Sequence, residues 1–286
     1  MQNYMKGKIC LVTGATSGIG LEIAGGLAAL GATVIIAGRN EDIGKQVVQD
    51  IKKRTGNGFI ELMLADFSTQ AGVIHLADMV KERYDKLDVL VNNAGLYQPD
   101  HTLTSDGIEM TFAVNYLAPF LLSHELHDLL LKGQPSRIVI TASSFHKTGY
   151  LDFNDLNMNE KKYSGMQAYM NSKVALIMFT YTLAEKVKGM GITVNAVHPG
   201  IVKTKLPRQR SFYSFLLKAI PFFLTPKQGA KTSIYLASSP EVEHITGKYF
   251  IRKKPAQSSD TTYSIELQKQ LWEKSCELTH VNGYEQ

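Results

Sequence analysis

The chain has 286 residues, of which 44% are hydrophobic and 20% are charged, and this balance is typical of an ordered globular protein. Its net charge is only +5 and its lysines are scattered, which argues against a nucleic-acid-binding stripe but suits an anionic small-molecule ligand. The two cysteines, Cys10 and Cys276, lie far apart in the sequence. Their spacing indicates neither a disulfide framework nor a zinc site, and we expect no bound metal.

The first predicted strand lies close to the N-terminus. Residues 8–13, KICLVT, form a short apolar run bounded by glycine, as buried strands do. We expect no signal peptide before it, and no run in the sequence approaches the roughly 18 apolar residues that span a bilayer. The sequence therefore predicts a cytoplasmic protein without a transmembrane anchor.

A glycine-rich turn follows this strand and precedes a helical pattern. The turn, GATSGIG, contains Gly14, Gly18 and Gly20, and the apolar residues of 21–31 then recur at helical spacing. Glycine tolerates positive φ and lets a phosphate approach the backbone, and the helix N-terminus offers free amides to an anion. The order of strand, turn and helix predicts a dinucleotide site, with a purely structural turn as the alternative.

The second predicted strand, 32–38, carries information on the choice of cofactor. Folds that prefer NAD usually place an acid at the end of this strand to hold the ribose 2′-hydroxyl. Here the chain continues Gly38-Arg39-Asn40, so an arginine stands where a 2′-phosphate could be met. This favours NADP(H); the alternative is a solvated arginine. Glu41 and Asp42 more plausibly open the next helix, 41–55.

Polar and small residues follow the third and fourth predicted strands. Strand 59–65 is followed by Asp66, which could contact an adenine or cap the next helix, 69–84, a role for which Ser68 competes. The fourth strand, 87–91, leads into Asn92-Asn93-Ala94-Gly95. Small and amide residues at this strand end suit close approach by a cofactor.

The next two elements contribute an amide and two hydroxyls. Residues 107–131 predict a long helix that is kinked at Pro119, and Asn115 just before the kink could hold a water or could simply be a satisfied buried amide. The fifth strand, 137–143, ends in Ser143, followed by Ser144. A hydroxyl here could bind a substrate oxygen or could cap a turn.

Tyr169 and Lys173 are four residues apart in a helical pattern, 167–188, and so share one face. A nearby ammonium is expected to lower the pKa of a phenol from its usual value of about 10, so this pair could exchange a proton with an alcohol or carbonyl oxygen. The same spacing recurs at Tyr4/Lys8 and Tyr249/Lys253, so spacing alone does not single out Tyr169.

The last third of the chain begins with a sixth strand, 192–200, which ends in His198-Pro199-Gly200. Residues 203–227 mix apolar and basic residues between prolines, which indicates a lid over an apolar pocket, a membrane-touching patch or ordinary core packing. A helix over 226–238 and a last strand over 247–251 precede a polar extension, 252–286, with a C-terminal helix. We find no repeat and no domain boundary, so we predict one doubly wound, Rossmann-type α/β domain with a parallel sheet.

Five of these features together resemble the short-chain dehydrogenase/reductase family. They are TGATSGIG, NNAG, Asn115, the ASS strand end and the Tyr169/Lys173 pair, which occur in the family's order over nearly the whole chain. RIVITASSFHKTGYLDFNDLN, AYMNSKVAL, AVHPGIVKTKL and GKYFIRKKP further resemble the retinol dehydrogenase group. Membrane-bound members of that group carry an N-terminal hydrophobic anchor, for which we expect no counterpart here.

The resemblance implies a role for each matching residue. Tyr169 would be the acid/base, Lys173 would lower its pKa and hold the nicotinamide ribose, Ser143 would position the substrate oxygen, and Asn115 would hold a proton-relay water. The glycine turn would hold the pyrophosphate, Asp66 the adenine, Asn93 to Gly95 the adenosine ribose, Arg39 the 2′-phosphate, and Val202 and Thr204 the nicotinamide end. The complete cofactor-binding set is Gly14, Thr16, Ser17, Gly18, Ile19, Gly20, Arg39, Asn40, Asp66, Phe67, Asn93, Ala94, Gly95, Tyr169, Lys173, Val202 and Thr204.

The expected activity is that of an NADP(H)-dependent oxidoreductase which interconverts an apolar alcohol and its aldehyde or ketone, of retinoid, lipid or steroid type. Two alternatives stay open: a cofactor-binding regulatory or scaffolding protein without turnover, and a reductase of a carbon–carbon double bond. Helices 107–131 and 167–188 are used for dimer packing in many relatives, so a homodimer is a further hypothesis.

Overall fold

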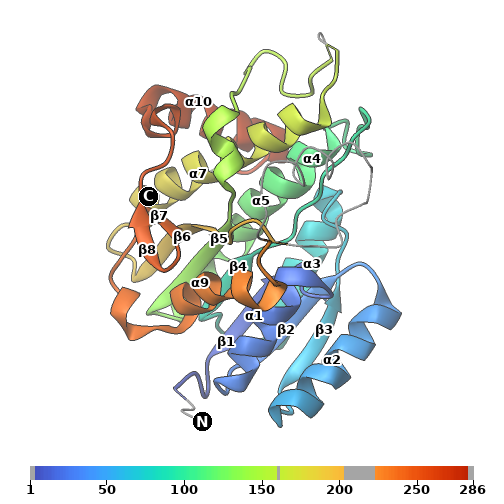
Figure 1. Ribbon diagram of the computed structural model, residues 1–286, viewed down its shortest axis with the longest axis vertical. Coiled ribbons are helices and arrows are strands. Elements are labelled where there is room, and N and C mark those ends of the chain that lie inside the picture. The colour runs from blue at the N-terminus through green and yellow to red at the C-terminus, as the bar shows by residue number, and fades with distance from the viewer. Residues whose placement is uncertain (1–3, 160–161, 203–222, 283–286) are drawn as a thin grey trace.

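The computed structural model describes residues 4–159, 162–202 and 223–282. Within these ranges, one sheet has the strand order β3-β2-β1-β4-β5-β6-β7-β8 (Figure 1). The strands are β1 (Ile9–Thr13), β2 (Thr33–Gly38), β3 (Ile60–Leu64), β4 (Val89–Asn92), β5 (Ser136–Thr141), β6 (Ile192–His198), β7 (Lys248–Ile251) and β8 (Lys254–Ala256). The helices are α1 (Gly18–Ala29), α2 (Glu41–Thr55), α3 (Gln70–Arg83), α4 (Met110–Phe112), α5 (Ala118–Glu125), α6 (His127–Lys132), α7 (Gly165–Lys186), α9 (Pro226–Ser238) and α10 (Ile265–Thr279).

Helices cover both faces of the sheet, as the unbroken apolar runs of its central strands require. One core forms between the sheet and α1, α2 and α9, and the other between the sheet and α3, α5, α7 and α10. The strand order reverses between β1 and β4, so the carboxyl ends of these strands flank a crevice where ligands of doubly wound folds bind. The predicted fold is confirmed.

The predicted helix 107–131 is wrong in detail. Residues 107–109 are not helical; the Glu109 carboxylate instead caps α4 by accepting hydrogen bonds from the amides of Thr111 and Phe112 at 2.9 and 2.7 Å. A π-helical turn, Ala113–Leu117, then separates α4 from α5. The helix is wider at this π turn, just before Pro119, whose nitrogen has no hydrogen to donate. A second break separates α5 from α6.

The strand 247–251 is not the last one. β8 pairs antiparallel with β7 through a turn in which Arg252 and Lys253 have φ of 49° and 66°. Such a turn normally carries asparagine or glycine. Because Arg252 and Lys253 stand there instead, the turn has no hairpin signature in the sequence. The sheet is therefore mixed, with one antiparallel edge strand beside seven parallel ones.

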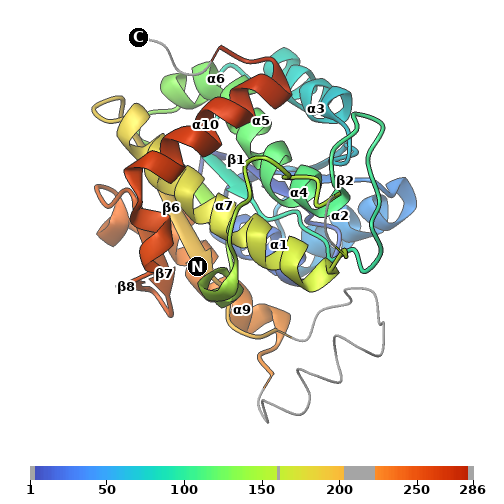
Figure 2. The ribbon, with the colours of Figure 1, turned by 90° about the horizontal axis from the view of Figure 1, so that it is seen from above.

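The C-terminal extension completes a core. Helix α10 lies across α5 and α7 (Figure 2), and its Ser275 hydroxyl contacts the buried Tyr116 hydroxyl at 2.6 Å. Of the proposed lid, 203–227, residues 203–222 lie outside the described residues. At its borders Val202 and Leu224 form a bridge, and the Leu224 amide donates to the Ile201 carbonyl at 2.8 Å. Among the described helices, none combines the length and apolar character that a membrane crossing needs.

Candidate active site

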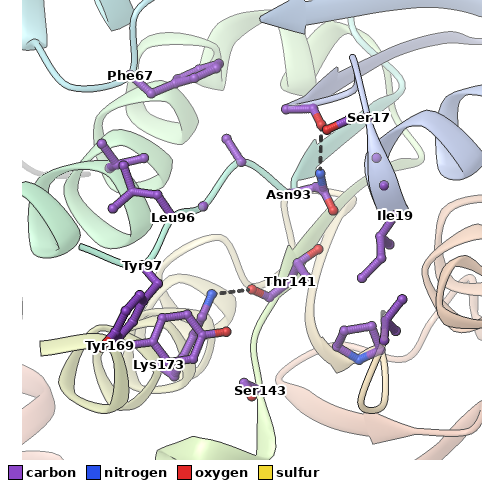
Figure 3. A pocket seen from close by; sticks show the side chains of 18 of the residues that line it. Ser17, Ile19, Phe67, Asn93, Leu96, Tyr97, Thr141, Ser143, Tyr169 and Lys173 are labelled. Atoms are coloured by element: carbon purple, nitrogen blue, oxygen red, sulfur yellow. Dashed lines mark hydrogen bonds between the residues drawn. The ribbon is translucent and has the colours of Figure 1, made fainter. Parts of the chain in front are cut away.

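A cavity of about 650 Å³ opens where β1, β2, β4, β5 and β6 end (Figure 3). Most of the predicted site residues line it, which places both the glycine turn and the Tyr169/Lys173 pair around one space. Those that line it are Gly14, Thr16, Ser17, Gly18, Ile19, Gly20, Arg39, Asp66, Phe67, Asn93, Ala94, Gly95, Ser143, Tyr169, Lys173 and Val202. Asn40 and Asn115 are not part of the lining, and Thr204 lies outside the described residues.

The glycine turn fits a dinucleotide because its backbone has no room for a side chain at Gly14 or Gly20. Gly14 and Gly18 have φ of 64° and 58°, which other residues rarely adopt. A Cβ atom on Gly14 would lie 2.8 Å from the Ala94 Cα, and one on Gly20 would collide with the Gly14 carbonyl oxygen. The Ser17 side chain makes no capping hydrogen bond, so the first amides of α1 stay available to a pyrophosphate in the cavity.

The residues at the end of β2 leave Arg39 facing the part of the cavity next to the glycine turn. Arg39 is exposed at the cavity rim, and a Cβ atom on Gly38 would lie only 2.7 Å from the Thr16 methyl, so an acidic side chain at position 38 would collide with the turn. Asn40 caps α2 instead of facing the cavity, since its Oδ1 accepts the Ile43 amide at 2.8 Å.

Asp66 also lines the cavity. Burial raises the pKa of its carboxyl, but hydrogen bonds from the Ser68 amide and hydroxyl, together with the Arg39 charge, outweigh burial and hold it below the usual value. Both helix-cap alternatives are wrong. Thr69 caps α3, because its Oγ1 accepts the Gly72 amide.

Ser143, Tyr169 and Lys173 meet in the cavity, from the end of β5 and from one face of α7 (Figure 3). Lys173 is 5% exposed; its Nζ donates to the Thr141 carbonyl at 3.2 Å and lies 5.3 Å from the centre of the Tyr169 ring. Burial lowers the pKa of Lys173 to about 8. Ser143 is buried, and its hydroxyl acts to lower the pKa of the Tyr169 phenol.

The sequence-based expectation for the phenol is wrong in direction. Burial raises the pKa of Tyr169 to about 12, and the Ser143 hydrogen bond, which acts the other way, does not offset it. An ammonium that is itself desolvated and directed at a carbonyl does not outweigh burial. Neither of the other two Tyr/Lys pairs lines this cavity: Lys8 binds Asp88 at 2.8 Å, and the Lys253 ammonium lies over the Tyr235 ring.

The family described as short chain dehydrogenase matches residues 8–211, which include the glycine turn and all three of these side chains. The chain belongs to the short-chain dehydrogenase family. Retinol dehydrogenase 13 of Mus musculus is 38% identical over 281 residues, which cover 95% of this chain and 84% of the relative. Human polyprenol dehydrogenase is 39% identical over 283 residues, covering 96% and 86%.

Solved structures agree with this assignment. A short chain dehydrogenase from Burkholderia cenocepacia J2315 in complex with NADP superposes with a TM-score of 0.71 at 32% identity, over 86% of this chain and 96% of that one. The resemblance to the retinol dehydrogenase group is thereby confirmed, as is the fold of a short-chain dehydrogenase.

Asn115 occupies the interior of this short-chain dehydrogenase rather than the cavity surface. Its Oδ1 accepts the Leu96 amide at 2.7 Å, and its Nδ2 donates to the Leu96 carbonyl at 3.0 Å and to the Ser172 hydroxyl at 3.1 Å. The amide thus fixes the loop after β4 against α7. Its role toward a proton-relay water stays a prediction.

Several residues that shape the site were not singled out from the sequence. The Thr13 hydroxyl accepts the amides of Asn93 and Ala94, both at 2.9 Å, and so holds the loop after β4 beside the glycine turn. Thr141 supplies the carbonyl that binds Lys173. His198 was noted only as part of a strand end, yet it lines the cavity beside Ser143. A polar residue at the end of a buried strand was the available signal for Thr13.

Proposed function

We propose that this short-chain dehydrogenase interconverts an apolar alcohol and its aldehyde or ketone with NADP(H). The observation that carries the proposal is the meeting of a phenol, a serine hydroxyl and a buried lysine on one wall of a cavity whose other end is a dinucleotide cradle. The nicotinamide cofactor, when bound, supplies or accepts the hydride. The protein's contribution is geometry and a proton.

Each of the three side chains then has one task. In carbonyl reduction the Tyr169 hydroxyl donates its proton to the substrate oxygen. Ser143, which lines the cavity beside the phenol, donates its one hydroxyl hydrogen to the same oxygen. The Lys173 ammonium stabilises the phenolate that remains, because it is the nearby positive charge in a buried site. In alcohol oxidation the same groups act in reverse.

NADP(H) rather than NAD(H) is supported by Arg39 at the cavity rim and by the collision that excludes an acid at position 38. Arg39→Ala is expected to raise the KM for NADPH about 10–100-fold and to leave that for NADH nearly unchanged, because one charge-assisted contact is worth about 1.5–3 kcal/mol. Initial rates with both cofactors measure this. Arg83→Ala, which removes an exposed arginine on α3, is the control. Equal effects on the two cofactors would show that Arg39 does not read the 2′-phosphate.

The substrate is proposed to be a long, apolar alcohol or carbonyl compound. The substrate side of the cavity is lined largely by apolar and aromatic residues, namely Leu96, Tyr97, Met110, Val114, Phe145 and Phe223. The names of two relatives, retinol dehydrogenase 13 and polyprenol dehydrogenase, refer to isoprenoid alcohols, which have this character.

A graded series of straight-chain aldehydes tests both reaction and substrate class. With NADPH, kcat/KM is expected to rise about fourfold with each methylene until the apolar side is filled, since each buried methylene contributes about 0.8 kcal/mol. NADPH oxidation followed by absorbance gives the rates. No turnover with any aldehyde or ketone, despite NADPH binding, would favour the regulatory alternative instead.

The assembly and location of the protein are also proposals. Helix α10 covers Phe120 of α5 and Phe179 of α7. A second copy of the chain that formed a dimer through α5 and α7 would therefore have to pack beside α10. The homodimer and the cytoplasmic location stay predictions, which light-scattering mass and cell fractionation test respectively.

A further inference from the structure

Two histidines hold opposite ends of the peptide unit that follows Ser143. The carbonyl oxygen of Ser143 lies 2.6 Å from His146 Nδ1, and the amide of the next residue, Ser144, donates to His198 Nδ1 at 3.2 Å. The two imidazoles approach from different elements, since His146 lies in the turn after β5 and His198 ends β6. Together they fix a single peptide plane at the cavity wall.

The hydrogen-bond partners define the tautomer of each ring. The Ser259 amide donates to His146 Nε2 at 3.0 Å, so Nε2 carries no hydrogen and Nδ1 must carry the proton that it donates to the Ser143 carbonyl. The Ser144 amide needs an acceptor, so His198 Nδ1 is bare and its proton lies on Nε2. The contacts in which His146 Nε2 accepts the Ser259 amide and His198 Nδ1 accepts the Ser144 amide exist only while the imidazoles are neutral.

The outer end of this chain of hydrogen bonds is anchored to the helix that carries Tyr169. Ser259 precedes a short 3-10 turn, Asp260–Tyr263, in the C-terminal extension. Its neighbour Ser258 contacts the Tyr181 hydroxyl of α7 at 2.7 Å and the Thr262 hydroxyl at 2.6 Å. The extension therefore connects α7 to the peptide unit beside Ser143.

We propose that His146 and His198 are positioning residues that, as neutral imidazoles, hold the Ser143–Ser144 peptide so that the Ser143 hydroxyl meets Tyr169 and the substrate oxygen. This role rests on the proposed function of Ser143. Ser143 has an extended backbone, with φ of −157° and ψ of 157°, and its Oγ also accepts the Phe145 amide at 3.3 Å, so its hydroxyl direction depends on the orientation of this peptide. A displacement of the peptide would carry the Ser143 Cα with it and so move the hydroxyl away from the phenol.

The surroundings of both rings favour the neutral form. His146 is fully buried; Lys147 follows it, the Tyr249 ring of β7 packs edge-on against it at 5.0 Å, and His198 faces it from β6. Burial, with a smaller effect of the neighbouring cation, lowers the pKa of His146 below its usual value, although the hydrogen bond to the Ser143 carbonyl acts the other way. Burial and His146 lower the pKa of His198 to about 4.

Acid is therefore expected to release the Ser144 amide from His198 and the Ser259 amide from His146. Protonation would put a hydrogen on His146 Nε2 or on His198 Nδ1, where each now faces an amide N–H. The unfolded chain takes up these protons near pH 6.5 and the folded protein only at lower pH. The stabilising contribution of His198 is therefore complete above about pH 6.5 and is lost as the pH falls toward 4, and that of His146 is lost in the same direction.

Kinetics and spectroscopy of matched variants test the proposal. His146→Phe and His198→Leu are each expected to lower kcat about tenfold or more, with the KM for NADPH unchanged, because misplacement of a reacting group by an ångström is costly. His198→Asn keeps an acceptor and is expected to restore most of the lost kcat and to remove this residue's part of the activity loss between pH 6 and 4. His244→Phe, at an exposed histidine, is the control.

A readout that needs no turnover separates this proposal from the proposed function. In protein with ¹⁵N-labelled histidine, His146 is expected to show the Nδ1–H tautomer and His198 the Nε2–H tautomer, with His198 still neutral at pH 6. A charged His198 ring at pH 6, the opposite tautomers, or wild-type kcat in both apolar variants would overturn the proposal. If no carbonyl compound is turned over, the proposed function fails. The two ring tautomers and slow hydrogen exchange of the Ser144 amide then still test, without turnover, whether the two histidines hold the peptide.

Discussion

Tyr169→Phe is expected to lower kcat for carbonyl reduction by about 10²–10⁴-fold, because the variant keeps the ring in the cavity and removes only the proton donor. NADPH oxidation with the best aldehyde of the graded series measures the loss. The KM for NADPH is expected to change little, since the dinucleotide cradle is built from the glycine turn and the loop after β4. Near wild-type turnover would mean that another group protonates the oxygen.

Tyr249→Phe is the matched control for this experiment. Tyr249 is buried, precedes a lysine by the same four residues, and its hydroxyl has no hydrogen-bond partner among the residues that the structure describes. Removal of an unsatisfied buried hydroxyl leaves stability unchanged or improves it, and no change in kcat is expected. The comparison therefore separates loss of the phenol in the cavity from loss of a buried phenol as such.

Regular elements could be predicted where their ends carry a local chemical signature. The predicted bounds 41–55 and 226–238 match α2 and α9 because Asn40 caps the first, and Thr225 and Gln228 form a capping box around Pro226 at the start of the second. Residues 107–131 lacked such signatures. Glu109 as a cap and the widened turn before Pro119 depend on packing against the loops, which the apolar spacing does not record.

The site was predictable to the extent that it lies at strand ends. In a parallel sheet the carboxyl ends of the strands meet at one edge, so Gly14, Asp66, Asn93 and Ser143 could be brought together from the predicted parallel sheet alone. The contacts that orient them could not. The Ser259 amide and His146 are 113 residues apart, and nothing local to either residue indicates the other. Nor could the depth of burial be inferred, and burial decides the direction of the Tyr169 pKa.

Trp272→Ala is expected to lower the free energy of unfolding by about 3–5 kcal/mol, which corresponds to a melting temperature lower by about 10 °C. The Trp272 side chain is 8% exposed; its ring stacks on Phe179 of α7 with centroids 6.3 Å apart and meets the edge of Phe120 of α5 at 5.1 Å. Its loss leaves a cavity between α10 and the two helices beneath it. Thermal unfolding followed by circular dichroism measures the change.

Two further variants show what the lost stability means. Ile265→Ala, at a 76% exposed position of the same helix, is expected to change the unfolding free energy by no more than about 0.5 kcal/mol, whereas Trp272→Phe retains most of the packing. If Trp272→Ala unfolded at the same temperature as Ile265→Ala, α10 would not dock in solution. Below its melting temperature Trp272→Ala is expected to keep kcat, because Trp272 packs on the far half of α7, more than a full turn beyond Lys173, and not on the turn that carries Tyr169. A fall in kcat there would instead show that α10 helps to position Tyr169.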